Sequence, residues 1–238
     1  MEHAAMESAE VAELADMGAA PGSAGATMAC IAYERLEEMI ILGQLEPRTR
    51  LSEHMLSQAL SLGRTPIREA LQKLRENHLV EIRARSGVFV TEVNFRDQFL
   101  VMEVRWPLEC MVARRAARMA TLQDREAFAE IARSMRAVAE AGDKVGLMKV
   151  DREFKDLSLK VVRNKYLAAA LTPIHANARR FYFSHLKTTN VPIGRAHAVA
   201  IEAISQGDEA GAVAATELFL ADMEAFMKNA LADAVSHS

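Results

Sequence analysis

Residues 51–79 read LSEHMLSQALSLGRTPIREALQKLRENHL, and this stretch decides the first part of the fold. It predicts a short helix, a tight turn at Gly63, and a second helix that opens with Thr65 and Pro66. A threonine side chain can cap the first free N–H groups of a helix, and proline is tolerated best in the first turn. The stretch therefore predicts a helix-turn-helix in which Thr65 caps the second helix.

The second helix of this stretch has two different sides. Ile67, Leu71 and Leu74 recur at spacing i, i+4 and i+7, which predicts a buried side. Arg64 and Arg68 lie off that side, near the N-terminus of the helix. A rigid helix that carries arginines there suits the major groove of DNA. A solvated helical hairpin is the alternative, because short motifs of this kind also occur by chance.

A β-hairpin is expected directly after the second helix. Residues 79–92, LVEIRARSGVFVTE, alternate apolar and polar side chains on either side of a turn at Ser86 and Gly87. A hairpin that follows a helix-turn-helix is a wing, and Arg83 and Arg85 are expected to project from it toward a phosphate backbone or a minor groove. The hairpin therefore favours DNA binding over the plain helical hairpin.

The rest of the chain has almost no strand signal. Capping residues, glycines and prolines separate six expected helices, at about residues 95–119, 123–141, 144–162, 164–187, 192–206 and 209–233. Short connections between helices favour antiparallel neighbours. The expected fold class is mainly α: an N-terminal winged helix-turn-helix followed by an antiparallel all-helical bundle of about six helices.

The chain is expected to divide into three parts. Residues 1–27 hold five acids and no lysine or arginine, and end in a Pro/Gly/Ser-rich run, which predicts a flexible acidic and alanine-rich tail. Residues 28–93 form the expected winged helix-turn-helix domain. Residues 94–238 form the expected all-helical domain.

Composition limits the class of protein. The net charge of the 238 residues is −3, so nucleic-acid binding must come from a local basic surface. The two cysteines are too few for a disulfide framework and are expected to be reduced. No run approaches the roughly 18 apolar residues of a membrane span, and the N-terminus lacks the basic region of a signal peptide. A cytoplasmic protein with no membrane partner is expected.

These features resemble the GntR family of transcriptional regulators, in its FadR-like subfamily with an all-helical (FCD-type) C-terminal domain. The resemblance covers about residues 30–233. In the N-terminal half it rests on Gly43-Gln44-Leu45-Glu46-Pro47, Leu51-Ser52-Glu53, Arg64-Thr65-Pro66-Ile67-Arg68-Glu69-Ala70-Leu71 and Gly87-Val88-Phe89-Val90. In the C-terminal half it rests on Arg105 with Leu108-Glu109, Asp151-x-x-Phe154, Asn164 with Leu167, and His197 with Ala203-Ile204 and Gly207-Asp208.

The resemblance implies a non-enzymatic, ligand-responsive regulator, expected to be a repressor. It implies a homodimer that binds a pseudo-palindromic double-stranded DNA operator. It also implies that residues 94–238 bind an effector, typically a small carboxylic acid, and dimerise.

The resemblance also implies a set of DNA-contacting positions. One of them, His54, stands where the family often has an arginine, which weakens that contact. The full set is Arg64, Thr65, Pro66 and Arg68 on the second helix, His54 before it, and Arg83, Arg85, Ser86 and Gly87 on the wing.

Many members of this subfamily hold a divalent metal with one aspartate and three histidines. Asp151 and His197 match two of those positions, but Lys155 and Phe219 occupy the other two. An ammonium group and a phenyl ring cannot bind a metal, so a metal-free site without a cofactor is expected. In this site Arg105 and Lys155 would hold the effector carboxylate, with His197 as a hydrogen-bond partner. Asp151 and Lys155 are expected to pair at i, i+4.

Four alternatives remain at this point. The residues Asp151, Lys155 and His197 could form a buried polar network without a ligand, or the protein could be a metal-dependent member of the same family. A helical-bundle enzyme with an accessory winged helix is disfavoured, because none of the seven histidines follows a glutamate at the Glu-x-x-His spacing of di-iron bundles. A winged helix used only for protein contacts is the fourth.

Residues 179–183, RRFYF, and His185 crowd onto one expected helix. The aromatic rings are expected in the core and the two arginines at the surface or in dimer contacts, in preference to a place in the same cavity. His3, His175 and His237 carry no spacing signal.

Overall fold

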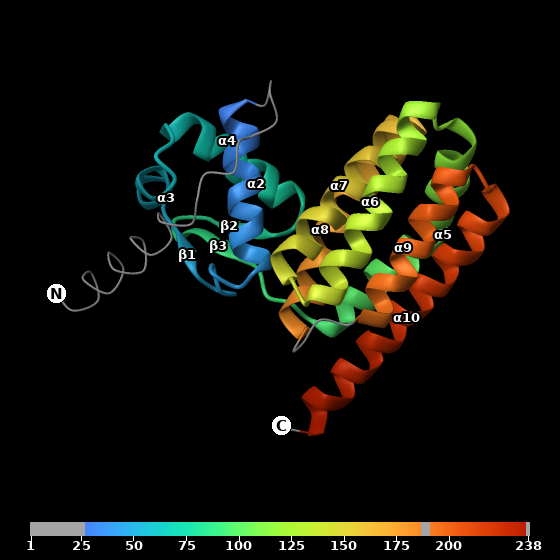
Figure 1. Ribbon diagram of the computed structural model, residues 1–238. Helices are drawn as coiled ribbons and strands as arrows, with labels where there is room; N and C mark the ends of the chain where they lie inside the picture. Colours follow the sequence, from blue (N-terminus) through green and yellow to red (C-terminus); the bar gives the residue numbers. More distant parts are fainter. Residues whose placement is uncertain (1–26, 187–190, 237–238) are drawn as a thin grey trace. The chain divides into compact units, whose positions relative to one another are not determined.

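The computed structural model describes residues 27–186 and 191–236, and Figure 1 shows its helices and strands. The chain divides into two compact units, one ending at Val93 and the other beginning at Asn94. The described residues are mainly helical with one small sheet, so the expected fold class is confirmed. His3, His237 and the tail expected before residue 27 lie outside the described residues.

The described residues of the N-terminal unit form a winged fold with three helices. Its helices are α2 (Met28–Ile41), α3 (Glu53–Ala59) and α4 (Arg64–Glu76). Its antiparallel sheet has the order β1-β3-β2, formed by β1 (Arg50–Leu51), β2 (Val80–Arg83) and β3 (Gly87–Val90). Val80 pairs with Val90 and Arg83 with Gly87, so the wing turns where the sequence predicts it.

The predicted apolar side of α4 forms the core of this unit. Ile67 and Leu74 are fully buried and Leu71 is nearly so, while Leu36 of α2 and Leu56 of α3 are buried in the same unit. Truncating a buried leucine to alanine costs about 2–5 kcal/mol, so this packing fixes the orientation of α4. Its opposite side then faces solvent.

The prediction that Thr65 caps α4 is wrong. The helix begins one residue earlier, at Arg64, and its N-cap is Gly63, whose backbone is extended (φ −63°, ψ 158°). Glycine is an accepted N-cap because an extended residue can precede the helix without a side-chain bond. Thr65 and Pro66 therefore both lie in the first turn of α4.

The C-terminal unit is a bundle of six helices, as predicted. They are α5 (Phe95–Met119), α6 (Leu122–Ala141), α7 (Lys144–Val162), α8 (Lys165–His185), α9 (Val191–Gln206) and α10 (Glu209–Ser236). Local signals set several boundaries: Thr121 and Asp124 form a capping box for α6, and Gly142 ends that helix at a left-handed φ of 74°.

Helix α5 runs through the bundle and packs against α7, α8, α9 and α10 (Figure 1). Its buried side carries Arg105 and Glu109, each about 4% exposed. Charged groups this deeply buried require partners. These partners come from the surrounding helices and define a polar centre inside the bundle.

No helix among residues 27–186 and 191–236 has the length and apolar character needed to cross a membrane.

Candidate functional site

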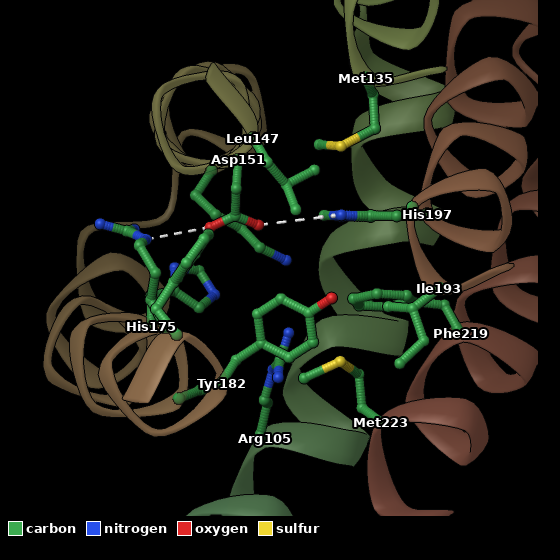
Figure 2. A pocket seen from close by; sticks show the side chains of 15 residues that line it. Arg105, Met135, Leu147, Asp151, His175, Tyr182, Ile193, His197, Phe219 and Met223 are labelled. Atoms are coloured by element: carbon green, nitrogen blue, oxygen red, sulfur yellow. Dashed lines mark hydrogen bonds and ion pairs between the residues drawn. The ribbon is translucent and has the colours of Figure 1, made fainter. Parts of the chain in front are cut away.

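A cavity of about 510 Å³, including its open mouth, lies inside the helical bundle (Figure 2). Its lining comes from all six helices. The polar members of the lining are Arg105, Asp151, Lys155, His175, Arg179, Tyr182 and His197. The apolar members include Met135, Leu147, Ile193, Phe219 and Met223.

Two donors that line this cavity converge on one oxygen of Glu109, a buried carboxylate beside it. Lys155 Nζ donates to Glu109 Oε1 at 2.7 Å, and Arg105 Nε donates to the same oxygen at 3.1 Å. His175 Nε2 lies 3.2 Å from it. Glu109 therefore accepts one charge-assisted hydrogen bond from its own helix, α5, and one from α7, and it lies in contact with α8.

The expected Asp151–Lys155 pair is not the pairing that forms. Lys155 bonds to Glu109 of α5, and Asp151 instead accepts a bond from Arg179 Nε of α8 at 3.0 Å. His197 Nδ1 lies 3.8 Å from the other oxygen of Asp151 (Figure 2). The long side chain of Lys155 extends from α7 to Glu109 on α5. Asp151 pairs instead with Arg179 of α8.

The two carboxylates stay ionised in spite of their burial. Burial alone would raise the pKa of Asp151, but Arg179 and Lys155 lower it to about 2. Burial opposes ionisation of Glu109 as well, yet the cations Lys155 and Arg105 hold its pKa well below the usual value. Nearby opposite charges therefore outweigh desolvation at both positions.

The neutral groups of the site are kept neutral by burial. Burial lowers the pKa of His197 to about 3 and also lowers the pKa of His175. Burial raises the pKa of Tyr182 to about 12. At neutral pH both imidazoles are therefore uncharged and the phenol keeps its proton.

The placement expected for Arg179 and Arg180 is wrong. Both are buried, at 8% and 3% exposure, and Arg179 lines the cavity. Arg179 tolerates burial because Asp151 neutralises it. The expected core position of Phe181 and Tyr182 is correct, since they are 1% and 6% exposed.

Sequence reasoning missed four residues of the polar centre: Glu109, His175, Arg179 and Tyr182. A signal was present for each. Glu109 follows Arg105 at i+4, and His175, Arg179 and Tyr182 recur at i, i+4 and i+7 on α8. A polar stripe at this spacing indicates a helix side that faces other buried polar groups.

The residues of this site do not fit a resident metal ion. Phe219 stacks on His197, with ring centroids 4.1 Å apart, and Lys155 is engaged with Glu109. Of the four expected ligand positions, Asp151 and His197 are then left as donors, whereas a structural or catalytic zinc needs at least three protein ligands. Across the described residues, no group of three or more His, Cys, Asp or Glu side chains is arranged to hold a metal.

The second candidate site is the N-terminal turn of α4. Arg64, Thr65 and Arg68 are exposed, and Pro66 is half-buried beside them. Arg68 donates from Nε and one terminal nitrogen to the two carboxylate oxygens of Glu53, at 3.0 and 2.8 Å. The exposed arginine is therefore held by a two-point ion pair from α3.

His54 and the wing supply the remaining positions. His54 is exposed on α3 next to Glu53. Arg85 and Ser86 are exposed in the wing turn, where Gly87 has a φ of 111° that other residues rarely adopt. Arg83 bonds to Glu81 and covers the ring of Phe89 at 4.6 Å, so its guanidinium is partly engaged within the wing.

The sequence of each unit matches the model of a known protein family. Residues 31–90 match the model described as "Bacterial regulatory proteins, gntR family", and residues 100–222 match the FCD domain. The chain belongs to the GntR family of transcriptional regulators and carries an FCD domain. This family assignment indicates a DNA-binding regulator of transcription.

Two relatives with similar sequences come from Escherichia coli strain K12. The HTH-type transcriptional repressor RspR is 38% identical over 89 residues, which cover 37% of this chain and 39% of the relative. The HTH-type transcriptional regulator McbR is 28% identical over 120 residues, which cover 50% of this chain and 54% of the relative. The chain thus matches about two fifths to one half of the length of these relatives.

Solved structures share the fold. The structure of E. coli McbR/YncC has a TM-score of 0.73 at 19% identity, over 86% of this chain and 98% of that one. A GntR regulator from Rhodococcus sp. RHA1 has a TM-score of 0.65 at 22% identity, over 84% of this chain and 97% of that one. Likeness at this level of identity establishes the fold.

Proposed function

We propose that this protein is a ligand-responsive repressor that binds a pseudo-palindromic operator as a homodimer. Its effector is a small carboxylic acid that binds in the cavity of the C-terminal unit without a metal. The observation that carries the proposal is a half-open cavity lined by three buried cations, Arg105, Lys155 and Arg179, in a chain that also presents arginines on α4.

The proposed DNA contacts follow from the orientation of α4. Its core side is fixed by buried Ile67 and Leu74, so Arg64, Thr65 and Arg68 face solvent together at the N-terminal turn. The N-terminus of a helix favours phosphate oxygens through its free N–H groups and its dipole. Arginine pairs with guanine in the major groove through two parallel bonds.

The proposed role of the cavity follows from its charge and its size. A carboxylate that enters it would meet Arg105 and Lys155, while its carbon chain would contact Met135, Leu147 and Met223. Such a ligand would change the populations of dimer geometries, and hence the distance between the α4 helices of the two protomers. This supports effector-controlled binding to DNA.

The proposed dimer uses the exposed side of α5. Leu100, Val104 and Met111 are 55%, 49% and 48% exposed on that side. Exposed Glu103 lies toward one end of this apolar stripe and exposed Arg114 toward the other. Two copies of α5 packed antiparallel about a two-fold axis would cover the apolar stripe and bring each Glu103 near the partner's arginine.

Selection of binding sites from a random DNA pool tests the proposed function. The wild-type protein should enrich sequences with two half-sites related by a two-fold axis. Arg68→Ala should lose roughly 10- to 100-fold in affinity for those sequences, since a good bidentate base contact contributes about 1–3 kcal/mol. Its thermal midpoint should not change, because Arg68 is exposed. Asymmetric enriched sequences, or an unchanged affinity of Arg68→Ala, would contradict the proposal.

A further inference from the structure

The charges around the cavity do not cancel. Three cations, Arg105, Lys155 and Arg179, face two carboxylates, Asp151 and Glu109. Burial lowers the pKa of Lys155, but its bond to Glu109 at 2.7 Å favours the charged ammonium form. One positive charge is therefore left over in a space surrounded by low-dielectric protein. A buried surplus charge is costly unless a counter-ion joins it.

The other titratable groups of the lining do not alter this balance. His175 and His197 are uncharged at neutral pH, because burial depresses the pKa of each imidazole. Tyr182 keeps its proton, since its pKa is raised to about 12. The surplus is therefore a single positive charge across the neutral range.

Glu109 is the group that reduces the surplus from two charges to one. Its Oε1 atom engages Lys155 and Arg105 at 2.7 and 3.1 Å, while Asp151 is committed to Arg179. Glu109 thus acts as a carboxylate built into the protein beside the cavity, held there by two lining cations that a ligand would otherwise use.

We propose that Glu109 is a specificity-determining residue that limits the effector to a monocarboxylate with an uncharged, largely apolar body. This inference rests on the proposed function, because it takes the cavity to be the effector site. It goes beyond that function by naming the charge of the ligand and the residue that sets it.

Donors remain for one ligand carboxylate. Arg105 uses Nε for Glu109, which leaves its two terminal nitrogens, and Lys155 uses one of its three N–H groups. Within the described part of the chain, the buried hydroxyl of Tyr182 has no hydrogen-bond partner. In Figure 2 this hydroxyl points toward Phe219 and Ile193, across the cavity. A phenol O–H is a suitable further donor to a carboxylate.

The remainder of the lining rejects a second carboxylate. Met135, Leu147, Ile193 and Met223 offer no hydrogen bond to an anion, and no positive charge of the lining is left once one carboxylate has bound. An unpaired buried charge of this kind weakens binding by more than about 100-fold. Monocarboxylates should therefore bind at least about 100-fold more tightly than dicarboxylates of matched size.

Isothermal titration calorimetry on the full chain in EDTA tests this with two matched pairs of probes. Hexanoate is compared with adipate, and benzoate with terephthalate; hexanamide is the uncharged control. We expect at least one monocarboxylate to bind, its dicarboxylate to bind at least about 100-fold more weakly, and hexanamide not to bind. Equal or tighter binding of the dicarboxylates, binding of hexanamide as tight as that of hexanoate, or no binding of any probe would overturn the proposal.

Substitution of Glu109 makes the test specific. Glu109→Gln removes one negative charge, so the surplus rises to two positive charges. Affinity for the dicarboxylate should then rise at least about 10-fold, and the preference for the monocarboxylate over the dicarboxylate should become smaller or reverse. Glu109→Asp keeps the charge and should keep the preference for one carboxylate. Glu126→Gln makes the same change in net charge at an exposed residue of α6 and should change neither affinity. An unaltered preference in Glu109→Gln would overturn the proposal.

A compensating pair of substitutions separates charge from folding. Lys155→Gln removes the surplus charge and should reduce hexanoate affinity at least about 10-fold; adding Glu109→Gln to it restores one surplus charge and should restore binding. Failure of that rescue in a double variant with an unchanged thermal midpoint would overturn the proposal. Site selection from random DNA is scored separately: its failure beside retained hexanoate binding would refute the proposed function and leave the specificity of Glu109 intact.

Discussion

The ring of Phe219 stacks on the imidazole of His197, with centroids 4.1 Å apart and ring planes inclined by 11°. Phe219 thereby covers one side of a histidine that also lies 3.8 Å from Asp151. On the neighbouring helix, Lys155 is drawn to Glu109 at 2.7 Å. The polar centre of the bundle is therefore held together by direct ion pairs and ring stacking.

The first prediction concerns zinc. Protein equilibrated with zinc and then dialysed should retain less than about 0.1 zinc per chain by mass spectrometry, because Lys155 and Phe219 leave two of the four expected ligand positions without a metal-binding group. The double variant Lys155→His/Phe219→His is the positive control. It adds two imidazoles beside Asp151 and His197 and should retain about one zinc per chain. A wild-type protein that retains one zinc per chain would contradict this account of the site.

The second prediction concerns pH. His197 has a pKa of about 3 in the folded chain and near 6.5 when unfolded, so below pH 6.5 the unfolded state binds one more proton. Stability must then fall as pH falls, by about 1.4 kcal/mol per pH unit between pH 6 and 4 for this residue. Asp151, with a folded pKa of about 2, adds to the loss only below about pH 4.

Urea unfolding followed by the fluorescence of Trp106 measures this loss. Trp106 is the single tryptophan of the chain and lies on α5, so it reports on the C-terminal unit. His197→Asn should reduce the slope of stability against pH by about 1.4 kcal/mol per pH unit, because it removes one titrating imidazole. Identical slopes for variant and wild type between pH 6 and 4 would show that His197 is not held neutral.

The sequence predicts local features of this protein well. Ile67, Leu71 and Leu74 lie within two turns of one helix, and the wing turns within four residues at Gly87, so short-range spacing determines both. The N-cap of α4 lies two residues before the expected one, because Thr65 and Gly63 are both plausible caps and the backbone decides between them.

Partners across helices were much harder to predict. Lys155 and Glu109 are 46 positions apart, and only the packing of α7 against α5 brings them within 2.7 Å. Along the sequence the nearest carboxylate at helical spacing was Asp151, so the wrong pair was expected. Burial of Arg179 was missed for the same reason, because the carboxylate that neutralises it lies on another helix.

The third prediction concerns the ion pair between Glu53 and Arg68. Glu53→Gln should release the guanidinium and increase affinity for random-sequence DNA by a factor of about 2–5, as expected for loss of an exposed ion pair. Discrimination in favour of selected sites should fall, because the arginine is no longer held in one orientation. Fluorescence anisotropy with labelled duplexes measures both.

Glu69→Gln is the matched control for this measurement. Glu69 is exposed on α4, so the substitution changes the charge equally without touching Arg68's partner. An equal loss of discrimination in Glu53→Gln and Glu69→Gln would mean that the effect is one of net charge alone.

The fourth prediction concerns the proposed dimer. Val104→Glu should raise the dimer dissociation constant at least about 10-fold in analytical ultracentrifugation, because it places a charge in the apolar stripe of α5. Val199→Glu makes the same change at a residue of similar exposure on α9 and should leave the constant unchanged. Equal effects of the two substitutions on the dissociation constant would show that α5 does not form the dimer interface.

Charge reversal tests the antiparallel arrangement of the two α5 helices. Glu103→Arg should weaken the dimer, and addition of Arg114→Glu should restore it, since the two residues exchange roles across the two-fold axis. A double variant as weak as the single variant would exclude this pairing.

The measurement that tests the central claim most directly is a thermal-shift titration with hexanoate in the presence and absence of EDTA. A ligand that binds only the folded state stabilises it by RT ln(1 + [L]/Kd), so the unfolding midpoint rises with the ligand concentration. Because Arg105 and Lys155 supply the positive charge at this site, the midpoint should rise equally with and without EDTA. A shift that disappears in EDTA and returns with added zinc would contradict the account.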